Sequence, residues 1–168
     1  MRVFVDLSKA VPAAQIEGED PHETHELKVL LREASTYLQS FAWCRRIREE
    51  YMGIGVGGVI GVFLFRIIPS GDDVDEWVWV VAGDLPLAYI TAEEAPNAAC
   101  ALDAYIGAMD RWVAAAKVGD PTDGLIPVDV PPSPEHARQL EARLRFLDRE
   151  ILSRYGEDLA QSPQRSSK

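Results

Sequence analysis

The chain has 168 residues, of which 47% are hydrophobic and 26% are charged, and its 17 basic and 27 acidic side chains give a net charge of −10 at pH 7. This composition excludes a wholly disordered chain, a collagen and a coiled-coil rod. The acidic balance argues against nucleic acid and anionic membranes as partners, because both repel a negative surface. It keeps the chain soluble whatever its role, and it also suits a basic protein partner attracted over a long range.

The length and the pattern of the chain predict a single α+β domain over residues 1–160 and a disordered tail over residues 161–168. The first residues lack the apolar core of a signal peptide. The longest uncharged run, residues 52–65, is too short and too rich in glycine to span a membrane. We therefore expect a cytoplasmic protein, and its oligomeric state stays open.

The first part of the chain predicts a short edge strand over residues 2–7 and then a long helix. Asp20 can cap this helix, Pro21 suits its first position and Glu23 completes a capping box. Apolar residues follow at helical spacing, so we expect the helix to cover residues 21–40.

Residues 42–53 are ambiguous, because Trp43, Ile47 and Tyr51 fit one face of a helix and also one face of a strand. We favour a strand that begins near Ile47. The glycines of residues 53–58 predict a turn. They match the string Gly-x-Gly-x-x-Gly, but a strand follows them, whereas a dinucleotide site needs a helix there.

Residues 59–68 are apolar on both faces and rich in branched and aromatic side chains, which is typical of a central strand. We expect Val62 and Leu64 on one face and Phe63 and Phe65 on the other, with both faces buried.

A short turn then leads to a second strand over residues 77–82, so the two strands predict an antiparallel hairpin, and residues 88–91 can resume the sheet. Further helices are expected to open at Pro96 and after Ser133. Strands in the middle and helices around them predict an α+β fold, with an antiparallel sheet of about three to five strands packed against about three long helices.

The residue types that hold metals or cofactors give weak signals. Cys44 and Cys100 lack metal-ligand spacing and lie among apolar residues, which predicts two buried, reduced thiols. His22 and His25 could share a metal, although a solvated helix start explains them better. We expect no metal and no cofactor.

Asp72, Asp73, Asp75 and Glu76 form the densest acidic run, at the predicted hairpin turn. A solvated turn explains the run, and a contact for a basic partner is the functional alternative. A cation site is a third interpretation, although the run lacks the residue order of a calcium loop.

Asp84 and Tyr89 are further candidates beside the sheet. Asp84 follows an aromatic strand, and closing its own turn is its simplest role. A catalytic carboxylate would need a second acid or a base across a cleft. Trp77 and Trp79 share one side of their strand and fit either core packing or an exposed aromatic surface.

Several blocks resemble small bacterial proteins of unassigned function: Phe63-Leu-Phe-Arg, Asp75-Glu-Trp-Val-Trp-Val-Val-Ala-Gly-Asp-Leu-Pro, Ala88-Tyr-Ile, Ala101-Leu-Asp-Ala-Tyr-Ile and Ile126-Pro-Val-Asp-Val-Pro-Pro. The likeness covers about residues 40–150. Such small acidic proteins are similar to the immunity proteins of bacterial toxin systems. The resemblance carries no catalytic residue over to this chain.

These features together predict a small acidic binding protein, rather than an enzyme, that neutralises a basic protein partner such as a toxin. The side chains expected to bind the partner are Asp72, Asp73, Asp75, Glu76, Asp84 and Tyr89. Two alternatives stay open: a small ligand-binding domain or enzyme that uses Asp84 and Tyr89, and a structural subunit of a larger assembly.

Overall fold

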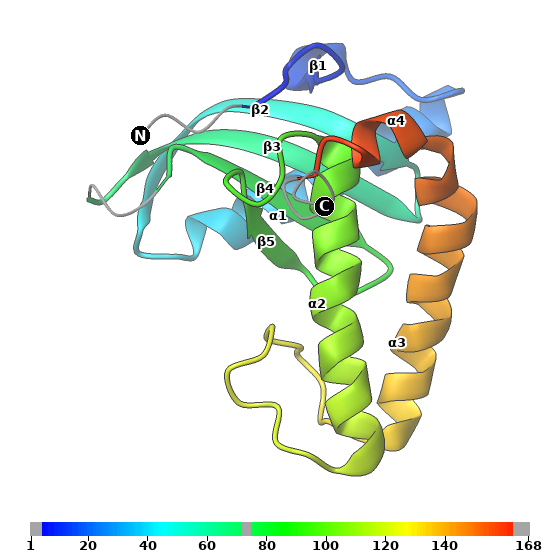
Figure 1. Cartoon of the computed structure of the whole chain (residues 1–168). Coiled ribbons are helices and arrows are strands. Elements are labelled where there is room, and N and C mark those ends of the chain that lie inside the picture. Colours follow the sequence, from blue (N-terminus) through cyan, green and yellow to red (C-terminus); the bar gives the residue numbers. More distant parts are fainter. Residues whose placement is uncertain (1–4, 72–74, 163–168) are drawn as a thin grey trace.

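The computed structural model describes residues 5–71 and 75–162. At its centre is a five-stranded antiparallel sheet in which each strand pairs with its neighbour in sequence. The strands are β1 (Val11–Pro12), β2 (Cys44–Val56), β3 (Ile60–Pro69), β4 (Trp77–Gly83) and β5 (Ala88–Thr91). The α-helices of the described residues are α1 (Pro21–Gln39), α2 (Ala98–Val118), α3 (Pro134–Phe146) and the short α4 (Gly156–Leu159). The predicted α+β class, with an antiparallel sheet and three long helices, is confirmed (Figure 1).

Different helices cover the two faces of the sheet. α1 packs on the face that carries Phe63 and Phe65, and α2 packs on the face that carries Val62 and Leu64. All four of these side chains are fully buried, as expected for a central strand. Each face of the sheet therefore has its own apolar core.

α1 begins as predicted and ends one residue earlier. The Asp20 carboxylate accepts a hydrogen bond of 2.8 Å from the backbone N–H of Glu23. The Glu23 carboxylate accepts from the backbone N–H of Glu19 at 2.8 Å and from that of Gly57 at 3.2 Å. Glu23 thus also ties the start of the helix to the turn between β2 and β3.

α2 and α3 lie side by side and extend beyond the sheet (Figure 1). α2 begins at Ala98 rather than at Pro96, because the Asn97 side chain caps it by accepting a backbone hydrogen bond of 2.9 Å. α3 begins after Ser133 as predicted and continues into a π-helical segment, Leu147–Ile151. No helix in the described part of the chain is long and apolar enough to cross a membrane.

The edge strand predicted over residues 2–7 is wrong where the structure describes that segment, because the edge of the sheet is β1. Asp6 instead lies in a turn, in which its carboxylate accepts a hydrogen bond of 2.9 Å from the backbone N–H of Ser8. A carboxylate bonded to the backbone two residues ahead favours a turn over an extended strand. Residues 1–4 lie outside the described residues.

β2 starts at Cys44, three residues before Ile47, so the strand that we favoured for this segment is confirmed. It also runs through Gly53, where we expected a turn. A side chain at Gly53 would collide with the Cβ of Ala98 on α2, so glycine here serves the close packing of a strand under a helix. The turn itself falls farther on, at Gly58, whose φ is +74°.

The last described residues belong to the fold rather than to the predicted tail. Ser162 is buried, and its backbone N–H donates to the carbonyl of Leu159 at 3.1 Å. The amide of Asn97 donates to the carbonyl of Asp158 at 3.0 Å, which holds this end of the chain against α2. Residues 163–168 of the predicted tail lie outside the described residues.

Candidate functional site

The structure separates the acidic side chains that we expected to bind a partner. Asp72 and Asp73 lie outside the described residues. Asp75 and Glu76 come directly before β4, whereas Asp84 comes directly after it. The acidic turn and Asp84 therefore lie at opposite ends of a strand of seven residues.

The charge of Glu76 is already compensated. Arg66 on β3 lies 3.2 Å from the carboxylate of Glu76 and 2.8 Å from that of Glu49 on β2. Its guanidinium also lies over the ring of Trp77, 5.6 Å from the ring centre. The Tyr51 hydroxyl donates to Glu49 at 2.6 Å, and this bond together with Arg66 lowers the pKa of Glu49. Glu49 and Glu76 thus share one guanidinium at this end of the hairpin.

Asp84 forms an ion pair with another element instead of closing its own turn. Its Oδ2 lies 3.2 Å from Nε of Arg143 on α3. The two side chains are 74% and 47% exposed. An exposed pair of this kind contributes about 0–1 kcal/mol to stability, so a ligand can open it at low cost.

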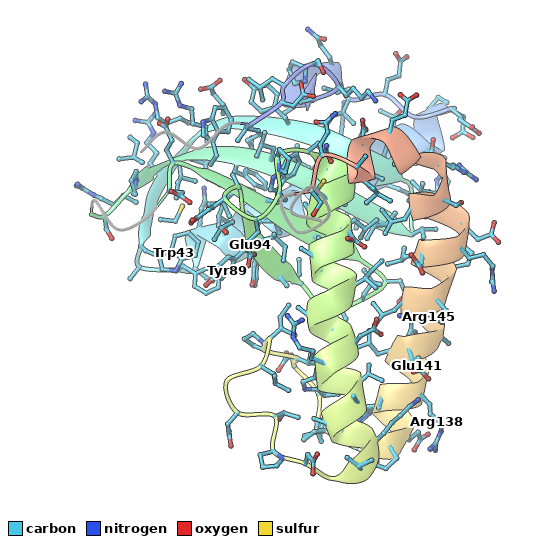
Figure 2. The ribbon with its side chains drawn as sticks, in the orientation of Figure 1. Trp43, Tyr89, Glu94, Arg138, Glu141 and Arg145 are labelled. Atoms are coloured by element: carbon cyan, nitrogen blue, oxygen red, sulfur yellow. The ribbon has the colours of Figure 1, made fainter. Side chains whose placement is uncertain are left out.

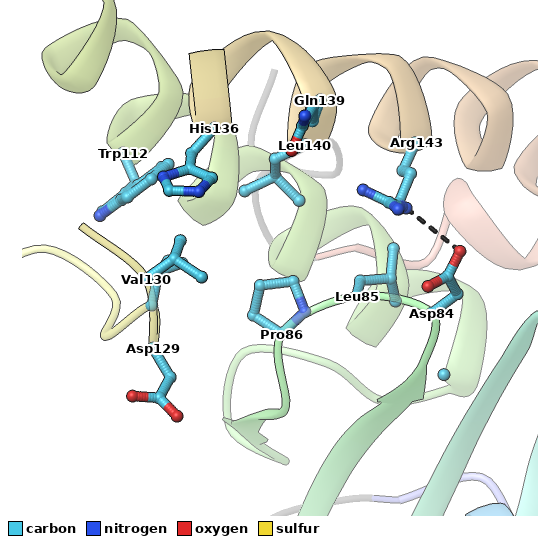
Figure 3. A pocket seen from close by; sticks show the side chains of 12 residues that line it. Asp84, Leu85, Pro86, Trp112, Asp129, Val130, His136, Gln139, Leu140 and Arg143 are labelled. Carbon is cyan, nitrogen blue, oxygen red and sulfur yellow. Dashed lines mark hydrogen bonds and ion pairs between the residues drawn. The ribbon is translucent and has the colours of Figure 1, made fainter. Parts of the chain in front are cut away.

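The ion pair lies at one end of a cavity between α3 and the turn that follows β4 (Figure 3), and a second cavity adjoins the same pair. A cavity of about 360 Å³ on one side has an apolar lining of Leu85, Pro86, Trp112, Val128, Val130 and Leu140. A cavity of about 350 Å³ on the other side is lined by Val59, Leu85, Ala142, Phe146 and Leu147. Asp84 and Arg143 line both cavities, and we call the whole feature the Asp84–Arg143 cleft.

Two residues hold the turn that forms one wall of this cleft. Gly83 has a φ of +147°, and a side chain there would collide with the backbone carbonyl of Val59. The Tyr105 hydroxyl, from α2, donates to the carbonyl of Pro86 at 2.6 Å. Burial raises the pKa of Tyr105 well above its ordinary value, so the hydroxyl keeps its proton and remains a donor.

α3 supplies the other wall, with His136, Gln139 and Arg143 at intervals of three and four residues. Nδ1 of His136 lies 2.9 Å from the carbonyl oxygen of Pro131 and 3.1 Å from the hydroxyl of Ser133. Because a carbonyl oxygen can only accept, Nδ1 is the nitrogen that donates to Pro131, and Nε2 faces away from this bond. The cleft therefore combines a carboxylate, a guanidinium, an amide and an imidazole.

A second surface is aromatic. Tyr37, Phe41, Trp43 and Tyr89 form one group in which neighbouring ring centres lie 5.0–5.3 Å apart. Tyr89 is 38% exposed and the other three are half-buried. Burial raises the pKa of Tyr37 to about 12. We call these four residues the aromatic patch, and Figure 2 labels Trp43 and Tyr89, which contact each other.

The structure does not bring Asp84 and Tyr89 together. Tyr89 packs against Phe41 and Trp43, which follow the end of α1. Asp84 points to Arg143 of α3 (Figure 3). A single site that uses both Asp84 and Tyr89 is therefore not formed, and each belongs to a different surface.

The residues considered for metal binding lie apart. The His22 side chain is 82% exposed, and its Nε2 lies 3.5 Å from the carboxylate of Glu26. Within the described ranges, no group of three or more His, Cys, Asp or Glu side chains could hold a metal ion. Cys44 and Cys100 are buried thiols, as expected.

Comparisons of this chain with protein-family models, with curated proteins and with solved structures find no match. Its function has to be inferred from the two surfaces themselves. Sequence reasoning missed Arg143, because its contact with Asp84 joins two residues that are 59 positions apart in the chain. It also missed the aromatic patch. Three of its four aromatic residues lie within residues 37–43, and such a cluster in the sequence could have indicated an aromatic surface.

Proposed function

We propose that this chain is a binding protein that neutralises a basic protein partner, as the immunity proteins of bacterial toxin systems do. The observation that carries the proposal is the aromatic patch, which places two tyrosines, a tryptophan and a phenylalanine in mutual contact at the surface of an acidic chain. Tyrosine and tryptophan are enriched among the side chains that dominate binding energies at interfaces.

The patch is pre-arranged for binding. Phe41 contacts Tyr37, Trp43 and Tyr89, so the rings limit one another's rotation before any partner arrives. Side chains that are already ordered lose little conformational entropy when a partner covers them. The patch can therefore supply contact area at low cost.

Charged side chains that lie close to the patch in sequence are expected to orient the partner. Glu93 and Glu94 are exposed and follow β5, which carries Tyr89. Arg45 and Arg46 are exposed and come two and three residues after Trp43, at the start of β2. We expect basic groups of the partner to face the two glutamates, while the net charge of −10 attracts the partner from a distance.

The test begins with affinity capture on this chain from cells of the source organism, followed by expression of the captured partner alone. We expect the partner to arrest growth, co-expression of this chain to restore growth, and the purified pair to form a stoichiometric complex. A captured partner that does not arrest growth contradicts the proposal.

A double variant then tests the surface. Trp43→Ala with Tyr89→Ala should fail to protect the cells, because each lost anchor weakens binding by about 2 kcal/mol, which is about 30-fold in Kd. Phe146→Ala is the matched control, since Phe146 is 41% exposed and lies outside the patch. Equal protection by the double variant and the control would show that the partner docks elsewhere.

A further inference from the structure

The Asp84–Arg143 cleft lies apart from the aromatic patch and presents two opposite charges side by side. A single contact of 3.2 Å joins Oδ2 of Asp84 to Nε of Arg143. Among the described residues, neither side chain makes a further hydrogen bond. Oδ1 of the carboxylate and the terminal N–H groups of the guanidinium are therefore available to a ligand.

This pair of charges selects against a ligand with one charge only. A ligand with only a carboxylate would be attracted by Arg143 and repelled by Asp84. A ligand with only an ammonium would be attracted by Asp84 and repelled by Arg143. A ligand that carries both charges a short distance apart satisfies both side chains at once. An α-amino acid has this arrangement, because its ammonium and carboxylate share one carbon atom.

The walls of the cleft select an apolar side chain. Beside the ion pair, the cavity of about 360 Å³ presents Trp112, Val130 and Leu140 (Figure 3). This volume lies near the lower end of the range for ligand pockets, about 300–1,000 Å³, so it suits one side chain rather than a large ligand. Asp129 lines the same cavity, but its carboxylate points away from Arg143 (Figure 3).

We propose that the cleft binds a zwitterionic α-amino acid with an apolar or aromatic side chain. The ammonium bonds to Asp84, the carboxylate bonds to the terminal nitrogens of Arg143, and the side chain occupies the cavity beside Trp112. The proposal goes beyond the neutralisation of a protein partner and does not depend on it.

Titration of the ¹⁵N-labelled full chain, followed by amide chemical shifts, tests the ligand class. We expect L-phenylalanine and L-leucine to cause saturable shifts in Asp84, Leu85, Leu87 and residues 136–147. N-acetyl-L-phenylalanine lacks the ammonium, L-phenylalanine amide lacks the carboxylate, and glycine lacks the side chain, so each should bind about tenfold more weakly or worse. The two blocked compounds also imitate the ends of a peptide, which carry one charge each.

No saturable shift at millimolar L-phenylalanine would overturn the proposal. Binding of either blocked compound as tightly as L-phenylalanine would also overturn it, because the cleft would then recognise a peptide end or an apolar surface instead of a zwitterion.

Variants locate the two charges. Asp84→Asn and Arg143→Met should each weaken the binding of L-phenylalanine about tenfold or more. Asp110→Asn and Arg145→Met are the controls, because these two side chains pair with each other at 2.7 Å on the same pair of helices and line neither cavity of the cleft. Both controls should bind as the parent does, and circular dichroism verifies that all four variants are folded. Binding that survives both Asp84→Asn and Arg143→Met, or that is lost equally in the controls, contradicts the proposal.

Discussion

Replacement of Tyr105 by phenylalanine tests whether a single hydroxyl holds the turn at the Asp84–Arg143 cleft. Tyr105 is fully buried, and its hydroxyl donates to the carbonyl of Pro86 at 2.6 Å. Tyr105→Phe removes one oxygen and keeps the ring, so the packing of α2 on the sheet should be unchanged. The carbonyl of Pro86 then loses its partner within the protein.

The expected cost follows from that lost bond. A carbonyl left without a partner in a part-buried position costs about 1–2 kcal/mol. For a domain of about this size, each kcal/mol lowers Tm by about 2–4 °C, so the variant should melt about 2–8 °C below the parent. Circular dichroism during heating and during urea unfolding measures this difference.

Tyr51→Phe is the matched control, because the Tyr51 hydroxyl also makes one bond of 2.6 Å, but to the half-exposed carboxylate of Glu49. Its cost should stay within about 0.5 kcal/mol, as is usual for surface substitutions. In Tyr105→Phe alone, the amide shifts of Leu85 and Leu87 should also move. If Tyr105→Phe were as stable as the parent and left those shifts unchanged, the hydroxyl would not be what positions the turn.

Three further outcomes can be measured. Gly83→Ala should lower the free energy of unfolding by about 2 kcal/mol or more, because φ is +147° there and the new Cβ would collide with the Val59 carbonyl. A urea midpoint equal to that of the parent would contradict this. Burial raises the pKa of Tyr37 from 10.0 to about 12, so the stabilisation by the buried neutral hydroxyl is complete below pH 10 and is lost as the pH rises through 12. The free energy of unfolding of Tyr37→Phe should therefore change less with pH between 10 and 12 than that of the parent. Arg66→Met should cost about 1 kcal/mol or less at neutral pH. Since Arg66 helps to lower the pKa of Glu49, the gap between parent and variant should close as acid protonates that carboxylate, and a gap independent of pH would contradict the pairing.

Local rules predicted much of the fold. The Asp20–Pro21 pair specified the start of α1, because a capping carboxylate and a proline have a fixed place in the first turn of any helix. Phe63 and its neighbours specified a buried central strand, because apolar side chains on both faces need cover on both sides. Neither inference required knowledge of distant parts of the chain.

Contacts between distant residues account for some of the errors. The local pattern placed Gly53 in a turn, whereas this glycine lies in β2 and allows Ala98 of α2 to approach the strand closely. The pairing of Asp84 with Arg143 depends on how α3 crosses the turn after β4, which no local pattern encodes. The start of α2 is an error of another kind, because it rests on a local contact: the Asn97 side chain caps the helix by accepting from the backbone N–H of Cys100, so the helix begins after Asn97 rather than at Pro96.

The charge of the chain also acts in two ways. The total charge attracts a partner at a distance, and single charged side chains matter once the partner is in contact. Beyond the Debye length of about 8 Å at physiological salt, a partner is steered only weakly, and it senses the summed charge rather than single pairs. Pairing of Arg66 with Glu76 leaves that sum unchanged, but it removes Glu76 as an open contact once the partner arrives. Glu93 and Glu94 are exposed beside the strand of Tyr89, and the described structure records no ion pair for them. The choice of partner should therefore depend on these glutamates and the aromatic patch more than on Glu76.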